Sequence, residues 1–479
     1  MNRRSFLIAA GAQLAAAPAK RPNVLFILPD EWRAQATGYN GDTNVHAPAL
    51  DRLARESVNF ENAISGNPVC CPFRASLMTG QYPLRNGVFI NDVELKPNGP
   101  TLGETFTQAG YRTGFIGKWH LYGSPDGKYG RRLAYIPRDK RFGFDYWKAC
   151  ECSHDYNHSL YYEGDDPAPK YWPGYDAIAQ TADACAFIEK QARSADPYFL
   201  VLSMGPPHFP LATAPERYQA QFRERAIELR PNVPKDRRKE ATGMLRGYYA
   251  HMAAVDDCLA SLLATLDRTG TADDTIVVFT SDHGDMMLSQ GLTTKLHPWD
   301  ESIRVPFLMR YPRKYGRKGR RLRTPLNSPD IMPTLLGACG LRVPDSVDGA
   351  DRSKLMESGA AALINLPAPI TEARRYGFAE YRGLRTARYT YVRSIHGPWL
   401  LYDNQRDPHQ MHNLCGTAGS KDLQSRLERA LDVRLRGAKD DFLPAAEYVR
   451  RAGVGHYREV TMAAGQARSP WGDWESTLK

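Results

Sequence analysis

Short apolar runs alternate with longer amphipathic stretches up to about residue 365. The runs 23–28, 197–204 and 275–280 are apolar at nearly every position, which is typical of parallel strands buried on both faces. The stretch 235–268 repeats its apolar residues at the helical period and leads into the last of these runs. Strands and helices therefore alternate, which predicts an α/β fold with a central, mostly parallel sheet.

The alternation ends near residue 365. Beyond it, 385–392 and 399–403 have the composition of antiparallel strands, and 420–437 suits a helix that covers them. We therefore expect a small antiparallel sheet after the main domain. The expected divisions are an export signal at 1–19, a main domain with the candidate chemistry at 20–365, a C-terminal subdomain at 366–455 and a tail at 456–479.

The region 123–195 is rich in Tyr, Trp, Gly, Asp and Pro and has no strong periodicity. It predicts a long insertion over the edge of the sheet, and such loops often border functional sites. Trp147 and Trp172 offer ring faces on which a sugar could stack, and His154 offers a partner for sugar hydroxyls. A structural role is the alternative for each of the three.

The N-terminus has the composition of a targeting segment. Arg3 and Arg4 precede Phe6 and an apolar run, and small residues follow at 15–19. The Arg-Arg-x-Phe-Leu order is similar to a twin-arginine export signal, with a general secretory signal as the alternative. We expect an exported, periplasmic protein. No stretch reaches the roughly 18 apolar residues that a membrane-spanning helix needs, so no membrane span is expected.

Composition narrows the possible partners. The net charge of +10 favours a polyanion, either a nucleic acid or a sulfated glycan. No zinc-finger spacing or aromatic-basic RNA-binding motif is present, so no nucleic-acid partner is expected. The eight cysteines are irregularly spaced in a chain of 479 residues, which argues against a disulfide scaffold.

Residues that can bind a metal follow two of the predicted strands. Asp30 and Glu31 end the run at 23–28, and Asp282 and His283 follow the run at 275–280. The carboxyl ends of parallel strands meet at one edge of a sheet, where open α/β folds bind their ligands. Carboxylate and imidazole ligands there predict a divalent metal site. The alternative is that the acidic residues only cap the next segments.

Other strand ends carry basic residues. Lys118 and His120 end a short strand, and their i, i+2 spacing would put both side chains on one face of an extended segment. This arrangement suits a cation that binds an oxyanion beside an imidazole that handles a proton. His208 lies between prolines after the strand at 197–204. For each of these residues in isolation, a solvated turn or loop is the alternative.

The segment 68–80, PVCCPFRASLMTG, predicts a loop that turns into a helix. Cys70 would lie just ahead of the helix N-terminus, where backbone N–H groups favour an anion and hence a nucleophile. The order Cys70-x-Pro72-x-Arg74, continued by Leu-x-Thr-Gly, resembles the signature of type I sulfatases, in which the first cysteine is converted to formylglycine. The family usually has Ser where Phe73 stands.

Further segments resemble the same family in the same order along the chain. They are Asp30-Glu31-Trp32-Arg33, the segment 110–120 with Lys118 and His120, Pro207-His208-Phe209-Pro210, Ser281-Asp282-His283-Gly284 with Lys295 and His297 beyond it, and Leu401-Tyr402-Asp403. The resemblance covers about 22–415. It implies an alkaline-phosphatase-like α/β sandwich with a small C-terminal antiparallel sheet. The family commonly has Asp where Glu31 stands.

The resemblance also implies roles for single residues. Asp30, Glu31, Asp282 and His283, with the modified Cys70, would hold a divalent cation; Lys118 and Lys295 would neutralise sulfate oxygens; Arg74 would steady the carboxylates and the modified side chain; His120 and His208 would transfer protons. Apart from the resemblance, we expect His154 to contact the sugar, and His297 as well, because it lies two residues after Lys295 and would face the same way in an extended segment. Calcium is the family's usual ion, and His283 leaves manganese or zinc open.

The implied activity is removal of sulfate from sulfated carbohydrates, with formylglycine made from Cys70 by a formylglycine-generating enzyme. One alternative is hydrolysis of phosphonate or phosphate esters within the same superfamily, because Asp-x-Trp-Arg also occurs in such relatives. Another is a non-catalytic protein that binds sulfated glycans, if Cys70 remains a thiol.

Overall fold

The computed structural model describes residues 21–123, 132–366 and 380–454. The predicted export signal at 1–19 and the predicted tail at 456–479 lie outside the described residues. Within the described part of the chain, none of the helices is long and apolar enough to cross a membrane.

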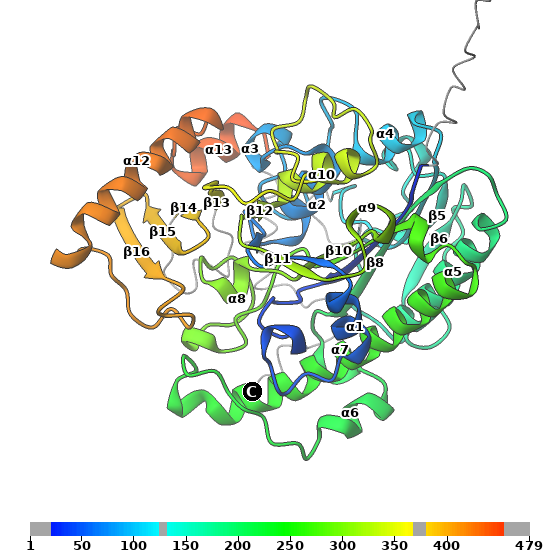
Figure 1. Cartoon of the computed structure of the whole chain (residues 1–479), viewed down its shortest axis with the longest axis horizontal. Helices are drawn as coiled ribbons and strands as arrows, with labels where there is room; N and C mark the ends of the chain where they lie inside the picture. The colour runs from blue at the N-terminus through cyan, green and yellow to red at the C-terminus, as the bar shows by residue number, and fades with distance from the viewer. Residues whose placement is uncertain (1–20, 124–131, 367–379, 455–479) are drawn as a thin grey trace, which may run out of the picture.

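The main domain is built on a ten-stranded sheet in the order β11-β2-β10-β9-β1-β8-β4-β5-β6-β7 (Figure 1). These strands are β1 (Asn23–Asp30), β2 (Val58–Phe60), β4 (Arg112–Lys118), β5 (Tyr146–Cys150), β6 (Leu160–Glu163), β7 (Lys170–Tyr171), β8 (Tyr198–Pro207), β9 (Thr275–Thr280), β10 (Phe307–Arg310) and β11 (Arg320–Leu322). A separate pair is formed by β3 (Ala63–Ile64) and β12 (Leu326–Asn327). The five central strands from β9 to β5 run parallel, which confirms the predicted fold class.

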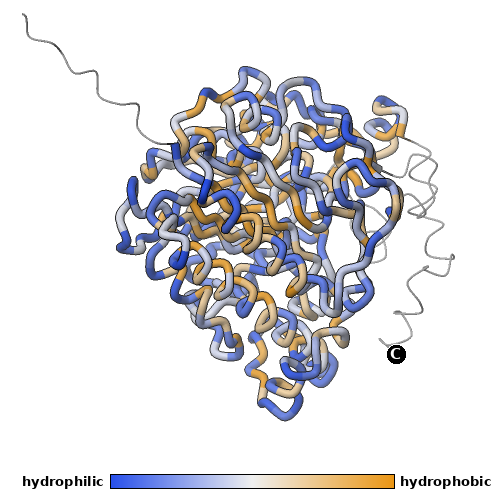
Figure 2. The backbone as a smooth tube through the Cα atoms, turned by 90° about the vertical axis from the view of Figure 1, so that its right-hand side faces the viewer, coloured by the Kyte–Doolittle hydropathy of each residue, from blue (hydrophilic) through white to orange (hydrophobic). Residues whose placement is uncertain are grey.

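The apolar runs are continuous because the central strands are buried on both faces. In β1, Val24, Phe26 and Leu28 belong to one hydrophobic cluster. Leu25 and Ile27, which alternate with them, belong to a second cluster on the opposite face. Figure 2 shows the hydrophobic segments gathered in the middle of the molecule. The sheet therefore separates two cores, and only the strand ends are free to carry polar residues.

Helices cover both faces of the sheet (Figure 1). Those against the second cluster are α1 (Pro48–Arg55), α5 (Asp176–Gln191), α6 (Glu216–Phe222) and α7 (Arg238–Arg268). Those against the first are α2 (Cys70–Thr79), α4 (Leu102–Gln108) and α10 (Ile331–Ala338). Shorter helices are α3 (Pro83–Asn86), α8 (Asp300–Ile303) and α9 (Pro312–Tyr315), with 3-10 turns η1 (Gly38–Asn40), η3 (Arg138–Lys140), η4 (Leu211–Thr213), η5 (Lys235–Arg237), η6 (Ala272–Asp274), η7 (Ser289–Gly291), η8 (Ser328–Asp330) and η9 (Ala418–Ser420).

The C-terminal part forms a four-stranded antiparallel sheet covered by a helix. Its elements are β13 (Ala362–Leu366), β14 (Tyr381–Arg385), β15 (Tyr389–Ser394), β16 (Gly397–Asp403), α12 (Lys421–Gly437) and α13 (Ala445–Arg451). The single strand predicted over 385–392 is wrong, because the backbone turns between Arg385 and Tyr389. The sheet also begins at Ala362, before the predicted division at 366.

The region 123–195 is more regular than its composition predicted. It contains β5, β6 and β7, which extend the main sheet, and the 16-residue helix α5. Trp147 and Trp172 are 1% and 6% exposed, and Trp147 stacks on Phe115 inside the first cluster. The prediction that these two tryptophans contact a sugar is therefore wrong, because their rings form part of the cores.

A neutral histidine joins three elements of the second core. His251 of α7 is fully buried; its Nε2 lies 3.1 Å from the Pro210 carbonyl oxygen, and its Nδ1 lies 2.6 Å from the Tyr175 hydroxyl. Since a carbonyl only accepts, Nε2 donates and Nδ1 accepts from Tyr175. Burial lowers the pKa of His251 to about 4 from an ordinary 6.5.

We predict that His251 makes the protein less stable as the pH falls from 6.5 to 4. The unfolded chain binds the proton first, so stability present above pH 6.5 is lost toward the folded pKa, by about 3 kcal/mol at most. Urea unfolding of the protein and of His251→Gln, which keeps the polar contacts but cannot titrate, measures this. The difference in unfolding free energy between the two proteins should change between pH 6.5 and pH 4. Parallel curves would show that His251 does not titrate as described.

Candidate active site

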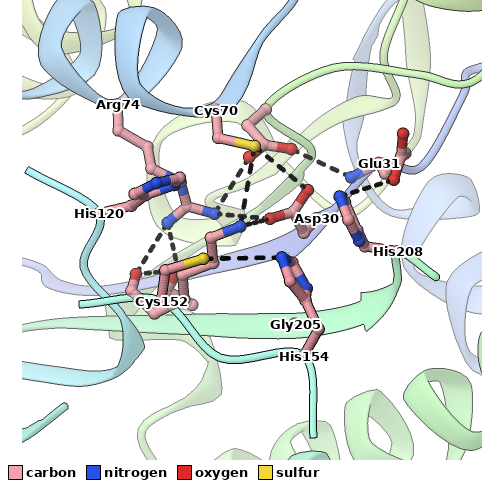
Figure 3. Close-up of polar contacts among 12 residues, drawn as sticks. Asp30, Glu31, Cys70, Arg74, His120, Cys152, His154, Gly205 and His208 are labelled. Atoms are coloured by element: carbon pink, nitrogen blue, oxygen red, sulfur yellow. Dashed lines mark hydrogen bonds and ion pairs between the residues drawn. The ribbon is translucent and has the colours of Figure 1, made fainter. Parts of the chain in front are cut away.

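Four segments far apart in the sequence bring their ends together at one edge of the sheet (Figure 3). Asp30 ends β1, Asp282 lies two residues after the end of β9, and Lys118 ends β4. Cys70 is the first residue of α2, whereas the sequence predicted that it lies just ahead of this helix. Because β9, β1, β8 and β4 are parallel neighbours, their carboxyl ends meet here, as the sequence predicted.

A possible metal site lies at this edge. Asp30, Cys70, Asp282 and His283 each place a ligand atom within 4.8 Å of the others, and all four are buried. His283 Nε2 lies 3.3 Å from Cys70 Sγ and 3.5 Å from the nearer Asp30 carboxylate oxygen. Two carboxylates and an imidazole, fully removed from water, are a donor set that fits a divalent cation.

Glu31 lies beside this group and faces the other way. Its backbone φ is +66°, which turns its side chain toward His208 and Lys295. One Glu31 carboxylate oxygen lies 3.0 Å from His208 Nε2, and the other lies 3.5 Å from Lys295 Nζ. Burial raises the pKa of Glu31 well above its ordinary value. Asp30, Glu31 and His208 form a second group of possible metal ligands.

Cys70 is surrounded by positive charge. Lys118 Nζ lies 3.7 Å and Lys295 Nζ 3.9 Å from its Sγ atom. Burial and Asp30 oppose ionisation of the thiol, but the two lysines and His283 lower its pKa well below the ordinary value. An anionic group is therefore stabilised at the start of α2, where the helix dipole also favours it.

Arg74 connects the helix to the carboxylates. It lies one helical turn after Cys70 and is 2% exposed. Its Nη2 donates to Asp282 at 3.1 Å and to Asp30 at 3.4 Å. Its Nη1 donates to the Ser203 hydroxyl at 2.7 Å and to the Lys118 carbonyl at 2.8 Å. One guanidinium thus links α2, β1, β4, β8 and the segment after β9.

Lys118 reaches the site because β4 packs very closely on β8. The preceding Gly117 has φ +102°, and a Cβ atom there would lie 2.0 Å from the Ser203 carbonyl oxygen. Only glycine fits both the backbone conformation and the space. Lys118 Nζ then donates to Asp30 at 2.6 Å.

His120 reaches the site by a different geometry from the predicted one. Its φ is +56°, so Lys118 and His120 are not neighbours on one face of an extended strand. His120 Nε2 lies 3.1 Å from Asp92, whose carboxylate also accepts from Arg132 Nε at 2.9 Å. Burial opposes protonation of His120, but Cys152, Cys71 and the Asp92 hydrogen bond raise its pKa well above the ordinary value.

His208 and His154 form the wall opposite His120. His208 Nδ1 donates to the Phe209 carbonyl at 2.9 Å, so its Nε2 accepts from Lys295 Nζ at 2.7 Å. The His154 ring stacks on the His208 ring with centroids 4.2 Å apart. Burial, followed by nearby lysines, lowers the pKa of both histidines well below the ordinary value.

His297 lies inside the protein. It is 0% exposed, and its Nε2 donates to the Thr293 carbonyl at 3.1 Å. Burial lowers its pKa to about 4. The prediction that His297 contacts a sugar assumed an extended segment after Lys295, but Leu296 between them has φ +72° and turns the chain inward. This placement does not support a substrate contact.

Sequence reasoning did not identify three residues of the site. Asp92 and Arg132 come from loops without a recognisable motif and orient His120. Cys152, 1% exposed, lies two residues after the end of β5, with its Sγ 3.6 Å from His154 Nε2 (Figure 3). Its position after a central strand was the one available signal, and it was hidden by the irregular composition of the region.

A buried nucleophile between carboxylates and two lysines, at the carboxyl edge of a parallel sheet, defines a hydrolase that acts on a negatively charged ester. The family model for sulfatases matches residues 22–341. The model for the C-terminal part of N-sulphoglucosamine sulphohydrolase matches residues 290–436.

Individual proteins agree with these matches. An ulvan-active sulfatase of Formosa agariphila is 43% identical over 90% of this chain and 84% of its own length. An endo-4-O-sulfatase of Bacteroides thetaiotaomicron is 30% identical over 88% and 93%. A structure solved in work on glycosaminoglycan metabolism by Bacteroides thetaiotaomicron has a TM-score of 0.80 and 28% identity over 91% of this chain and 99% of that one. The chain belongs to the type I sulfatase family of the alkaline-phosphatase-like superfamily, and it is a sulfatase.

We predict that Asp92→Asn lowers kcat/KM on a small aryl sulfate by about tenfold, because a neutral amide no longer orients His120 or favours its protonated form. The pH profile separates this role from a structural one. Since Asp92 raises the pKa of His120, the limb of the profile that reports His120 should move to lower pH. Asp145→Asn, which removes a 63% exposed carboxylate, is the matched control. An unshifted profile would contradict the role given to Asp92.

Proposed function

We propose that the protein hydrolyses sulfate esters of sulfated carbohydrates, with Cys70 converted to formylglycine and a divalent cation bound beside it. The observation that supports this most is the position of Cys70, which lies among Asp30, Asp282 and His283 and within 4 Å of two lysine ammonium groups. The substrate class is supported by the relatives, whose names describe an ulvan-active sulfatase and an endo-4-O-sulfatase.

The lysines bind the sulfate group in this proposal. Lys118 and Lys295 both lie within 4 Å of the Cys70 Sγ atom and neutralise the oxygens as negative charge develops on them. Arg74 keeps Asp30 and Asp282 in place. Formylglycine, once formed, supplies hydroxyl groups in place of a thiol, whose sulfated form would have no easy route to hydrolysis.

Asp30, Asp282 and His283, with the residue at position 70, would hold the cation, and Glu31 stands beside them. When bound, a divalent cation lowers the pKa of a hydroxyl and draws charge from a sulfate oxygen. Calcium suits the carboxylates best, whereas the imidazole of His283 also suits manganese or zinc.

Two histidines handle protons. Because Lys295 Nζ donates to His208 Nε2 at 2.7 Å, the lysine supplies a proton that His208 passes to the leaving alcohol. Asp92 raises the pKa of His120, so its neutral form is a strong base for the proton of the residue at position 70 when sulfate leaves. The partly exposed His154, stacked on His208, is the residue that we propose to contact the sugar.

The location of the enzyme follows from its first residues. We propose that the segment 1–19 directs export to the periplasm, where polymeric glycans and their fragments arrive. A formylglycine-generating enzyme is then required as a partner before or during export.

We predict that Cys70→Ala abolishes sulfate release from a sulfated oligosaccharide, by about a thousandfold or more, because the nucleophile is lost. Cys258→Ala, which changes a buried thiol of α7 outside the site, is the control and should retain activity. In protein made with a formylglycine-generating enzyme, the peptide mass should show CHO in place of CH2SH at position 70. Full activity of Cys70→Ala, or faster hydrolysis of an aryl phosphodiester than of a sulfate ester, would contradict the proposal.

We also predict that exhaustive chelation removes both activity and a stoichiometric amount of metal, and that calcium restores activity. The physical reason is that Asp30, Asp282 and His283 place buried ligand atoms within 4.8 Å of one another, a donor set that fits a divalent cation. Elemental analysis identifies the ion. Stronger recovery of activity with manganese than with calcium would assign manganese to the site. Full activity in metal-free protein would contradict the metal site.

A further inference from the structure

Two adjoining cavities lie where the main domain meets the C-terminal subdomain. Their volumes are about 380 and 480 Å³, and both are lined by Asn40, Gly41, Arg304 and Asn404. We call this continuous space the interdomain groove. Its volume is in the range of ligand sites. None of the residues that form the active site lines it.

A buried cation faces the first cavity. Arg33 is 2% exposed and lines the cavity wall. Its Nη1 donates only a long 3.4 Å hydrogen bond to the Met286 carbonyl, and its Nε has no partner. No carboxylate in the described part of the chain forms an ion pair with it. A guanidinium stays charged at any relevant pH, and Glu301 and Asp42 attract it only from beyond ion-pair distance, so its Nε–H group is left without an acceptor among the described residues.

The carboxylates of the first cavity are engaged elsewhere. Asp42 accepts from the Tyr249 hydroxyl at 2.8 Å, and Glu228 accepts from Thr43 at 3.1 Å. Asp300 forms a two-point ion pair with Arg385, with both distances 3.2 Å. None of these carboxylates therefore forms an ion pair with Arg33 within the described residues.

The second cavity is more strongly cationic. Four arginines line it against a single acidic residue, Glu61, which pairs with Arg321 at 3.0 Å; the arginines are Arg304, Arg321, Arg323 and Arg385. Arg323 is exposed and forms no ion pair within the described residues. The excess of guanidinium groups thus lies in the second cavity, toward the open end of the groove at Arg323.

A polar acceptor in the groove also lacks a partner. Gln35 is 9% exposed and lines the first cavity, and its Oε1 atom accepts no hydrogen bond in the structure. Carboxylate and sulfate groups have no proton to donate to it at neutral pH, whereas a sugar hydroxyl has one. An acidic carbohydrate therefore satisfies both kinds of unpartnered group, the guanidinium and the amide oxygen.

We propose that the interdomain groove is a second binding site for an acidic oligosaccharide, with one carboxylate or sulfate group against Arg33 and the chain leaving past Arg323. The planar guanidinium fork matches both anions. This inference rests on the proposed function for the class of ligand, since it gives an acidic glycan two places to bind on one enzyme.

The test is calorimetric titration of the whole protein with an unsulfated uronic acid oligosaccharide, which carries carboxylates but no ester for the active site. Saturable binding is expected, and Arg33→Gln should weaken it by about tenfold or more. Arg323→Gln should weaken it less. The matched control is Arg342→Gln, since the Arg342 side chain is 85% exposed and lies outside the groove. A neutral oligosaccharide of equal length should not bind.

A sulfated oligosaccharide, titrated into Cys70→Ala so that it is not consumed, tells the two anions apart. Two binding events are expected, of which Arg33→Gln removes one. If Arg33→Gln does not fold, Arg323→Gln and the salt dependence of binding decide the question. Unchanged affinity of Arg33→Gln and Arg323→Gln for the oligosaccharide overturns the proposed binding site in the groove and leaves the proposed sulfatase function unaffected. Binding at the groove without sulfate release from any sulfated carbohydrate supports the groove and overturns the proposed substrate class.

Discussion

The ion pairs of Arg74 with Asp30 and Asp282 are the contacts on which the site depends. They join α2 to the ends of β1 and β9, and all three side chains are nearly inaccessible to water. Two buried carboxylates side by side repel, and a single cation between them offsets that repulsion. Because the same guanidinium also holds the Lys118 carbonyl and Ser203, the strand ends and the helix that starts with Cys70 keep one geometry.

Positive charge around Cys70 has a second source in the loop that carries Lys295. That loop is held by the C-terminal subdomain: the Tyr381 hydroxyl donates to the Leu296 carbonyl at 3.0 Å, and Arg385 pairs with Asp300. The small sheet therefore contributes to the geometry of the active site. It holds the loop of one of the two lysines beside Cys70, and its junction with the main domain forms the interdomain groove.

The histidines of the site lie in distinct electrostatic settings. Asp92 and Cys152 favour the proton of His120, whereas desolvation and nearby lysines disfavour protonation of His208 and His154. His120 is therefore the strongest base of the three.

The sequence by itself determined the central strands, their polar ends and the place of Cys70 at a helix start. Continuous apolar runs such as 23–28 report burial on both faces, and the Cys70 motif is local. Tertiary structure alone decided the rest. Asp92 and Arg132 meet His120 through loops without periodicity, and His297 is turned inward by the positive φ of Leu296. Only the packed structure places Arg33, nearly inaccessible to water, in the wall of the interdomain groove. Such contacts join residues distant in the chain, so no local pattern encodes them.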